Sequence, residues 1–586
     1  MYASIFLHPG IIDKLTNELI MKKRQIGTLV FGLLIIFCFI QCKSTQEKDI
    51  KTELDSYFKQ QVNQCMGINE DITPGLSVII TKKDSILYKG SFGFANLDKE
   101  LQITENTVFD IASASKQFTG MAIALLEEKG LINIDDKIIN YLPDLPEAMS
   151  EITIYQLVHH TSGIRDWPNL FALKGWQPEE PLTLNDICEI LNKQEGLNFA
   201  PGTEFSYSNS NYNLLAKIIE AVTDTAFEDW MCDNIFAPLG MENTYYVESS
   251  SAEETTIADS YVYNGNNFVP FTNTLNAPGS SSLMSNTLDM SKCLINFNTK
   301  SLGEDGVFNK ITQKGKLSDG KNIDYGYGLY ITKIKNKTTY AHDGAWGGYR
   351  SATAFFPEEN IGVVVLSNNG TINPNKIMND IVDILFFEAK KEASDKSEIM
   401  EQEINDEFFA LCAGNYEQVD DKGCYLTFFK EDDAYYLNMY DKDFQLYAKS
   451  DSVFFVKEAD AEFVFHLRNG EVNSHTLKQN GNSYLALRVD ESKKDSTIIN
   501  YDKLSGTFYS KELDIEYEIK YLEDDLRIQS SIFSNDIILK HSEDNTFTSN
   551  SGLIQSVSFL EENGCIMSLV INNGRVRNLL FEKVSQ

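Results

Sequence analysis

Ser113-Ala114-Ser115-Lys116 opens a helical pattern in this chain and places a nucleophile one turn away from a base. Residues three apart lie on one face of a helix, one above the other, so Lys116 can reach the Ser113 hydroxyl. Apolar residues at helical spacing and a terminating glycine predict the helix: Phe118, Met121, Ala122, Leu125 and Gly130.

This pairing is suited to nucleophilic catalysis. A serine hydroxyl is a weak nucleophile until a neighbouring base accepts its proton. A desolvated lysine loses its own proton more readily, so Lys116 is a candidate for that base. The start of a helix also offers free N–H groups and the positive end of its dipole, which favour an oxyanion beside Ser113. A lone Ser-x-x-Lys is usually a solvated helix start, and a second copy at 318–321 lies in a turn-like segment, so the motif needs context.

Two further motifs follow in order along the chain. Tyr207 and Asn209 form Tyr-x-Asn, and residues 342–344 read His-Asp-Gly ahead of strand-like runs at 351–356 and 361–367. Taken separately, these residues would punctuate a loop or cap a turn. The ordered conjunction is much more specific than any one motif.

The order Ser-x-x-Lys, Tyr-x-Asn and Lys/His-x-Gly resembles the serine β-lactamase and penicillin-binding-protein superfamily. It is most similar to the class C β-lactamase and D-alanyl-D-alanine carboxypeptidase branch (peptidase family S12), which also contains esterases and D-amino-acid peptidases. Further segments agree with that branch: 74–78, 92–96, 157–164 and 325–329. The resemblance covers about residues 51–390 and implies an α+β serine hydrolase domain, with an antiparallel sheet flanked by helices plus an all-helical region.

The resemblance implies a two-step acyl transfer that ends in hydrolysis, with no cofactor. Ser113 attacks a carbonyl, and Lys116 lowers the barrier to removing the serine proton. Tyr207 shuttles the proton, and we expect adjacent positive charge to favour its phenolate. Asn209 can bond both Lys116 and a substrate amide. The backbone N–H groups of Ser113 and Ala345 are the implied oxyanion hole.

The third motif departs from the pattern of many β-lactamases. They carry Lys-Thr-Gly, whereas residues 342–344 read His-Asp-Gly, a form commoner among esterase and peptidase-like members. A lysine holds a fixed charge for a substrate carboxylate, but a histidine titrates near neutrality and is a weaker anchor. We therefore expect His342, Gly344 and Ala345 to line the substrate cleft, in an enzyme whose main task is not β-lactam hydrolysis.

A Ser–His–Asp triad is a second chemical hypothesis, with His342 as the base and an aspartate elsewhere. No Gly-x-Ser-x-Gly surrounds Ser113, which argues against it. His159 and His160 are interpreted as a structural corner. No His-Glu-x-x-His or paired Cys-x-x-Cys motif argues for a metal.

The N-terminal region predicts export. Residues 21–24 are Met-Lys-Lys-Arg, an apolar run spans 29–40, and Cys42 follows before a polar stretch. This order resembles a bacterial lipoprotein signal with lipidation at Cys42 and a true start at Met21, although Gln41 is larger than usual there. The alternative is an uncleaved anchor, and either places the enzyme at the cell envelope, as a periplasm-facing or surface lipoprotein.

Composition fits that placement. The chain carries 51 basic and 85 acidic side chains, a formal charge of −34, which argues against nucleic-acid binding. Seven cysteines outside the signal are widely spaced and odd in number. We therefore expect no disulfide framework and expect most of these thiols to be buried.

The sequence pattern of the last third of the chain predicts antiparallel β structure. Alternating or aromatic-rich runs lie at 425–429, 434–439, 453–456 and 462–467, broken by turn residues. A weak repeat begins at Gly414 and again at Gly506, which predicts two small all-β domains similar to the lipocalin-like modules that follow S12-type hydrolase domains. We expect them to serve accessory packing or to form a substrate rim. The predicted organisation is signal 1–42, linker 43–50, hydrolase 51–390, linker 391–405 and β domains 406–492 and 493–586.

Two function classes remain open. The first is a hydrolase that cleaves a D-amino-acid peptide, an ester or a β-lactam-like amide through an acyl-enzyme on Ser113. The second is a non-hydrolytic or slowly acylating protein that holds a cell-wall ligand on the same scaffold. The retained catalytic residue types favour the hydrolase, whereas a fold alone would not. The expected partners are a small-molecule or peptide substrate and a membrane that the chain reaches through its lipid anchor. Cell-wall fragments are one expected source of the substrate.

Overall fold

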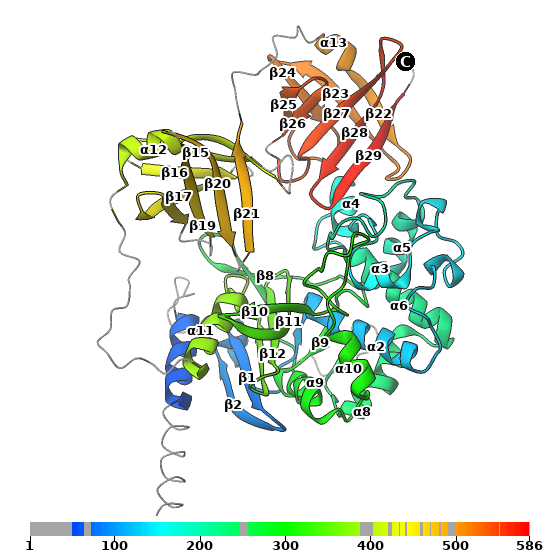
Figure 1. Ribbon diagram of the computed structural model, residues 1–586, viewed down its shortest axis with the longest axis vertical. Helices are drawn as coiled ribbons and strands as arrows, with labels where there is room; N and C mark the ends of the chain where they lie inside the picture. The colour runs from blue at the N-terminus through cyan, green and yellow to red at the C-terminus, as the bar shows by residue number, and fades with distance from the viewer. Residues whose placement is uncertain are drawn as a thin grey trace, which may run out of the picture.

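The computed structural model shows an α+β domain followed by two antiparallel β-barrels (Figure 1). The described residues are 50–63, 72–246, 256–386, 402, 404–419, 425–432, 434–439, 442–456, 461–468, 470–479, 482–489, 500–549 and 551–584. The predicted signal with Cys42, and most of the predicted linker 391–405, lie outside them. The predicted fold class is confirmed, and the predicted domain boundaries stay predictions.

A six-stranded antiparallel sheet forms the centre of the first domain, in the order β10-β11-β12-β13-β1-β2. Its strands are β1 (Leu76–Lys82), β2 (Ser85–Phe92), β10 (Tyr330–Ile334), β11 (Lys337–Trp346), β12 (Tyr349–Phe356) and β13 (Ile361–Ser367). The predicted strands at 351–356 and 361–367 are therefore confirmed.

Helices cover both faces of this sheet, which explains why β13 is mostly apolar and buried at every position. Successive side chains on a strand point to opposite faces. Val363 and Val365 accordingly pack in a core with the helix at residues 50–63 and with α11 (Pro374–Phe386). Val364 belongs to the core on the other face, where α9 packs on β1 and β13.

The remaining elements of this domain form the helical region and short edge strands. The helices are α2 (Lys116–Glu128), α3 (Ile154–Val158), α4 (Trp167–Leu173), α5 (Leu184–Asn192), α6 (Asn209–Thr223), α7 (Phe227–Met231), α8 (Ala237–Leu239), α9 (Thr287–Thr299) and α10 (Asp305–Ile311), with the short helices η1 (Ala112–Ser115), η2 (Ile138–Asn140), η3 (Glu147–Met149) and η4 (Cys232–Phe236). The short strands are β3 (Phe94–Asn96), β4 (Leu101–Gln102), β5 (Phe109–Asp110), β6 (Tyr245–Tyr246), β7 (Ser260–Tyr263), β8 (Phe268–Phe271) and β9 (Leu283–Ser285).

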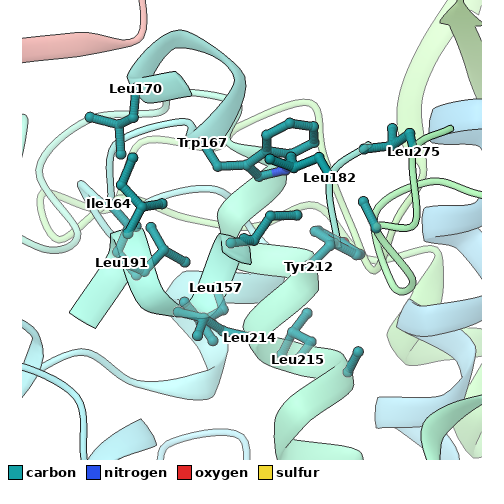
Figure 2. Close-up of a cluster of buried hydrophobic side chains, with 14 of the residues drawn as sticks. Leu157, Ile164, Trp167, Leu170, Leu182, Leu191, Tyr212, Leu214, Leu215 and Leu275 are labelled. Atoms are coloured by element: carbon teal, nitrogen blue, oxygen red, sulfur yellow. The ribbon is translucent and has the colours of Figure 1, made fainter. Parts of the chain in front are cut away.

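The helical region has its own apolar packing, which fixes the helices that carry site residues. Leu157 of α3, Trp167 of α4, Leu191 of α5 and Tyr212 of α6 belong to one cluster of buried apolar side chains (Figure 2). The Tyr212 hydroxyl donates to the Val158 carbonyl at 3.0 Å, so this buried ring is also held at its polar end. The start of α6 is therefore held against α3, and α2, which also packs on α6, is buried from residue 116 to residue 126.

The C-terminal third folds into two closed eight-stranded antiparallel barrels, drawn in yellow and in orange to red in Figure 1. The first contains α12 (Asp406–Cys412), β14 (Gly414–Gln418), β15 (Tyr425–Glu431), β16 (Ala434–Met439), β17 (Lys442–Ser450), β18 (Val453–Val456), β19 (Ala461–Arg468), β20 (Glu471–Gln479) and β21 (Asn482–Arg488). The second contains α13 (Tyr501–Leu504), β22 (Gly506–Ser510), β23 (Ile515–Leu522), β24 (Asp525–Gln529), β25 (Ile537–Glu543), β26 (Thr546–Thr548), β27 (Ser556–Glu562), β28 (Cys565–Asn573) and β29 (Val576–Lys583).

The weak sequence repeat corresponds to these two barrels. Each begins with a short helix and a strand that starts at glycine, Gly414 or Gly506, and each closes by pairing its first strand with its last. Closure leaves no open sheet edge in either barrel. The lipocalin-like prediction is confirmed.

Among the described residues, no helix is both long and apolar enough to cross a membrane.

The described cysteines differ in burial. Cys293 and Cys412 are buried, but Cys232 and Cys565 are exposed and Cys188 is half-buried. The expectation that most of the cysteines are buried is therefore wrong for those described.

Candidate active site

A buried carboxylate shapes the turn that carries Ser113. Ser113 lies in η1, directly before α2, at the predicted helix start. Asp110 Oδ1 accepts a hydrogen bond from the Ala112 N–H at 2.7 Å, and its Oδ2 accepts one from Asn273 at 2.8 Å. Ala112 has a φ of 47°, a conformation that a non-glycine residue adopts only where its surroundings enforce it. Asp110 therefore holds the turn beneath the nucleophile.

Lys116 is completely buried and connects three parts of the site. Its Nζ lies 3.1 Å from Ser113 Oγ, 2.7 Å from Asn209 Oδ1 and 2.7 Å from the Ser280 carbonyl oxygen. Burial lowers the pKa of Lys116 well below its usual range, and the nearby Arg575 charge acts in the same direction, while Asp166 opposes it. The expected contact between Ser113 and Lys116 is present.

Asn209 is oriented by an aspartate that the motifs did not indicate. Asp166 is 1% exposed, and its Oδ1 accepts the Asn209 backbone N–H at 2.7 Å, at the start of α6. Both Asp166 oxygens also accept from Asn209 Nδ2, at 3.1 and 3.2 Å. These contacts fix the amide so that Oδ1 faces Lys116. A carboxylate at this helix end is favoured by the helix dipole as well.

Tyr207 lies beside the same lysine. Lys116 Nζ is 4.9 Å from the centre of the Tyr207 ring, and His160 packs against that ring with centroids 4.3 Å apart. The Tyr207 hydroxyl is buried, and within the described part of the chain no atom meets hydrogen-bond geometry with it, although the Ser113 hydroxyl is near enough to lower its pKa. Burial outweighs that effect and raises the pKa of Tyr207 well above its usual range. The expectation of a phenolate is therefore wrong for the free enzyme.

His342 is a buried neutral ring. It is 3% exposed, and burial lowers its pKa to about 3, so the expectation that it titrates near neutrality is wrong. Its Nδ1 lies 2.6 Å from the Asp343 carbonyl oxygen, which can only accept, so Nδ1 carries the proton. Nε2 then accepts from the Tyr325 hydroxyl at 3.1 Å. Both nitrogens are thus engaged away from Ser113.

Gly344 and Ala345 bring strand β11 against the nucleophile turn. A methyl group at Gly344 would lie 2.4 Å from the Ile111 carbonyl oxygen and 2.8 Å from the Ser113 nitrogen. Only glycine allows this approach. Ala345 is the next residue on the strand and is exposed, so its backbone borders the space beside Ser113.

An apolar cavity of about 830 Å³ lies next to this strand end. Its wall includes Trp176 and Trp346, whose rings stack with centroids 6.1 Å apart, together with Ile532 and Leu553 from loops of the second barrel. Trp346 Nε1 donates to Asn273, the residue that bonds Asp110 below Ser113. The cavity wall and the nucleophile turn are therefore parts of one hydrogen-bonded assembly.

Comparison with known proteins decides the family. A family model described as Beta-lactamase matches residues 54–385, more than half of the chain. The chain belongs to the beta-lactamase family. The match falls inside the span of about 51–390 that the motifs indicated, and the predicted enzyme class, a serine hydrolase, is confirmed.

Two relatives extend the comparison. Penicillin-binding protein 4* of Bacillus subtilis is 28% identical over 442 residues, which are 70% of this chain and 94% of the relative. A D-aminopeptidase of Gluconobacter oxydans is 29% identical over 301 residues, half of this chain and 56% of the relative. A solved penicillin-binding protein homologue from Pyrococcus abyssi matches with a TM-score of 0.54 at 23% identity, covering 74% of this chain and 99% of its own, which shows the fold alone.

Ser113, Lys116, Tyr207 and Asn209 lie together as the sequence motifs predict, but two further residues of the site, Asp166 and Arg575, carry no such motif. Asp166 follows a loop with no motif of its own, and Arg575 belongs to a barrel hairpin far along the chain. The Asn-Gly turn at 573–574 signals a hairpin. Nothing in the sequence says that this hairpin meets the hydrolase domain. Within the described residues, no cluster of potential metal ligands is found.

Proposed function

We propose that this chain cleaves an amide or ester bond through an acyl-enzyme on Ser113. The observation that carries the proposal is the set of partners around Lys116. Asn209 Oδ1 and the Ser280 carbonyl can only accept hydrogen bonds, and Lys116 Nζ lies 2.7 Å from each. A neutral amine has two N–H donors, which these acceptors take up, and its lone pair then faces Ser113 Oγ at 3.1 Å.

Lys116 acts as the base in the acylation step. Ser113 Oγ attacks the carbonyl carbon while its proton moves to Lys116 Nζ. Tyr207, a neutral phenol, donates its proton to the leaving nitrogen or oxygen and is reprotonated by the Lys116 ammonium. The carbon–leaving-group bond breaks, and the acyl group remains on Ser113. General acid–base steps of this kind contribute roughly 10²–10⁴-fold in rate.

Deacylation uses the same groups with water in place of the leaving group. Lys116 accepts a proton from water, whose oxygen attacks the acyl carbon, and Ser113 recovers a proton as it departs. The N–H groups of Ser113 and Ala345 are proposed to stabilise the oxyanion in both steps. Water addition regenerates the free enzyme and releases a carboxylic acid.

The proposed substrate is a D-amino-acid peptide, amide or ester with an apolar side chain. Relatives named as a D-aminopeptidase and as a penicillin-binding protein support this class. The apolar cavity beside Trp346 offers room for such a side chain. Residues 342–344 read His-Asp-Gly where many β-lactamases carry Lys-Thr-Gly, so β-lactam turnover is proposed as secondary.

Turnover by matched variants tests the mechanism. The full chain, Ser113→Ala and Lys116→Arg are assayed on N-acyl D-amino-acid amides, short-chain esters and a cephalosporin. Arginine keeps N–H donors at this position but stays protonated and cannot serve as a base, so both variants should lose roughly 10²-fold or more of turnover. Full activity of Lys116→Arg would remove Lys116 from the base role. Binding without turnover in the unmodified chain would favour the binding-protein alternative.

We further propose that the chain is anchored in the bacterial cell envelope through lipid at Cys42. The basic, apolar and cysteine order of residues 21–42 supports the proposal. Metabolic labelling with a palmitate analogue should tag the natural chain but not Cys42→Ser. Equal labelling of both would leave an ordinary signal or an uncleaved anchor.

A further inference from the structure

The hairpin between β28 and β29 of the second barrel carries an arginine into the hydrolase site. Arg575 Nη1 pairs with Asp166 Oδ2 at 3.0 Å. Its guanidinium carbon lies 5.0 Å from the centre of the Tyr207 ring. Arg575 is therefore linked through Asp166 and Asn209 to Lys116, and it borders the predicted proton shuttle directly.

Backbone contacts on both sides of Arg575 fix the hairpin in this position. Asn198 Nδ2 donates to the Arg575 carbonyl at 2.8 Å, and Asn198 Oδ1 accepts the Arg577 N–H at 2.7 Å. Nearby, Arg165 is 1% exposed and pairs with the buried Glu512 of the second barrel. The Arg165 guanidinium also donates to the carbonyls of residues 577 and 578, at 3.1 and 3.0 Å. Polar contacts on both sides of Arg575 thus dock the hairpin on the hydrolase domain.

The Arg575 guanidinium keeps most of its donors available. Arginine has five N–H donors, and the hydrogen bond recorded for this side chain, within the described residues, is the one to Asp166. Its side chain is 48% exposed even though it lies over Tyr207, whereas Asp166 is 1% exposed. The Arg575 guanidinium is therefore partly exposed beside the Tyr207 ring, with donors left for a ligand.

Arg575 supplies a positive charge that the third motif, residues 342–344, lacks. His342 occupies the motif's lysine position and is neutral, and burial drives Lys116 toward its neutral form. Arginine remains protonated in proteins and matches the planar geometry of a carboxylate. The site thus has a fixed positive charge that comes from the barrel rather than from strand β11.

We propose that Arg575 binds a carboxylate of the substrate, so that the second barrel determines which substrates the hydrolase domain accepts. The inference rests on the proposed function, because it assigns a specificity residue to that same site. It gives the C-terminal barrel a direct contact with substrate rather than packing alone. Arg575 is a specificity-determining residue here, and Asp166 is a positioning residue that orients both Arg575 and Asn209.

Binding to an inactive full-length chain tests the proposal without depending on turnover. Calorimetry on Ser113→Ala compares N-acetyl-D-alanyl-D-alanine with the same dipeptide ending in a carboxamide. The carboxylate ligand should bind about tenfold tighter or more, as expected for a charge-assisted hydrogen bond. Adding Arg575→Gln, which keeps a donor for Asp166 but removes the charge, should abolish the difference.

Arg577→Ala on the Ser113→Ala background is the matched control. Arg577 lies on the same hairpin, but its side chain pairs with Glu204 at the surface. This variant should keep the carboxylate preference. Equal binding of both ligands to Ser113→Ala, binding of neither, or an equal loss for both ligands in Arg575→Gln would overturn the proposal.

The proposed function is tested separately in chains that retain Ser113. Turnover that is lost in Ser113→Ala while both ligands bind equally would overturn the carboxylate role and leave the hydrolase intact. Carboxylate binding that depends on Arg575, in a chain that never turns over, would overturn the hydrolase and retain the anion-binding role. The two failures are therefore distinguishable.

Discussion

At the scale of single residues, burial rather than residue type sets the protonation states of the ionisable side chains in the site. Lys116 and His342 are both basic side chains, yet both lie in surroundings that lower their pKa. Tyr207 lies in the same surroundings, and burial raises its pKa, which favours a neutral phenol. The resting site therefore contains a neutral amine, imidazole and phenol, and the mechanism moves protons through the amine of Lys116 and the phenol of Tyr207.

Tyr207→Phe and His342→Gln separate the lysine mechanism from a Ser–His–Asp triad. Loss of the Tyr207 hydroxyl should lower the single-turnover acylation rate roughly 10²–10⁴-fold while ligand binding changes little, because the ring remains. His342→Gln should retain acylation within about tenfold, because His342 contacts Tyr325 and not Ser113. A nearly silent Tyr207→Phe together with an inactive His342→Gln would instead establish the triad.

The buried histidines also predict how stability depends on pH. Burial lowers the pKa of His342 to about 3 and that of His159 to about 4, whereas both rings titrate near 6.5 when unfolded. Between pH 6.5 and about 4 the unfolded state therefore binds more protons, so stability falls as the pH falls. Each ring contributes about 1.4 kcal/mol per pH unit within that window.

Urea unfolding followed by tryptophan fluorescence measures this effect in the hydrolase domain, because all four tryptophans lie there: Trp167, Trp176, Trp230 and Trp346. The midpoint should shift to lower urea at pH 5 than at pH 7. His342→Gln should reduce that shift by the part that the His342 ring contributes. An unchanged shift in the variant would contradict the assignment of His342 as a buried neutral base.

At the scale of elements, the site depends on how closely β11 approaches η1. Gly344 is the residue at that contact, and its backbone lies against Ile111 and Ser113. The turn itself is held by Asp110 and by the strained backbone of Ala112. A strand and a 3-10 helix that are far apart in the sequence together define the space in which the oxyanion is proposed to form.

Gly344→Ala should separate these two elements, because the added methyl would meet backbone atoms that cannot move independently. We expect the hydrolase domain to lose about 1–3 kcal/mol of unfolding free energy, as for overpacked sites, and acylation to slow in parallel. Gly552→Ala is the control, since nothing lies within 4 Å of its added methyl. A Gly344→Ala chain as stable and active as the control would show that the approach is not needed.

Strands and helices with strong local patterns could be predicted from the sequence, and close contacts could not. Runs of β-branched and aromatic residues gave β16 and β18 their observed bounds, 434–439 and 453–456. The Ser113 helix was likewise indicated by its apolar spacing. The role of Gly344 as a contact point and that of Asp166 as an orienting carboxylate depend on neighbours distant in the chain, which local patterns do not report.

At the scale of the whole molecule, the second barrel belongs to the same packed unit as the helical region. One continuous apolar core contains Trp167 and Leu170 of the hydrolase domain together with Tyr517 and Phe581 of the barrel. The first barrel has a core of its own. Sequence composition identified both barrels and suggested a substrate rim, but it could not say which barrel docks, because docking depends on side chains such as Glu512 meeting their partners in space.

Glu512→Ala should weaken this docking, because it leaves the buried Arg165 guanidinium without its counter-charge. Removing one partner of a buried ion pair typically costs about 3–5 kcal/mol. Glu204→Ala removes the surface partner of Arg577 and should cost at most about 1 kcal/mol. Urea unfolding curves of the two variants provide the comparison, and equal stability would show that the Arg165–Glu512 pair does not hold the barrel.

The central claim, an acyl-enzyme on Ser113, is tested most directly by the mass of the quenched protein. The full chain is mixed with an activated D-amino-acid ester, stopped in acid within the first turnover, digested and analysed by mass spectrometry. The mechanism predicts an acyl adduct on the peptide that contains Ser113, and no adduct in Ser113→Ala. An adduct on another residue, or equal labelling of the Ser113→Ala chain, would contradict the mechanism.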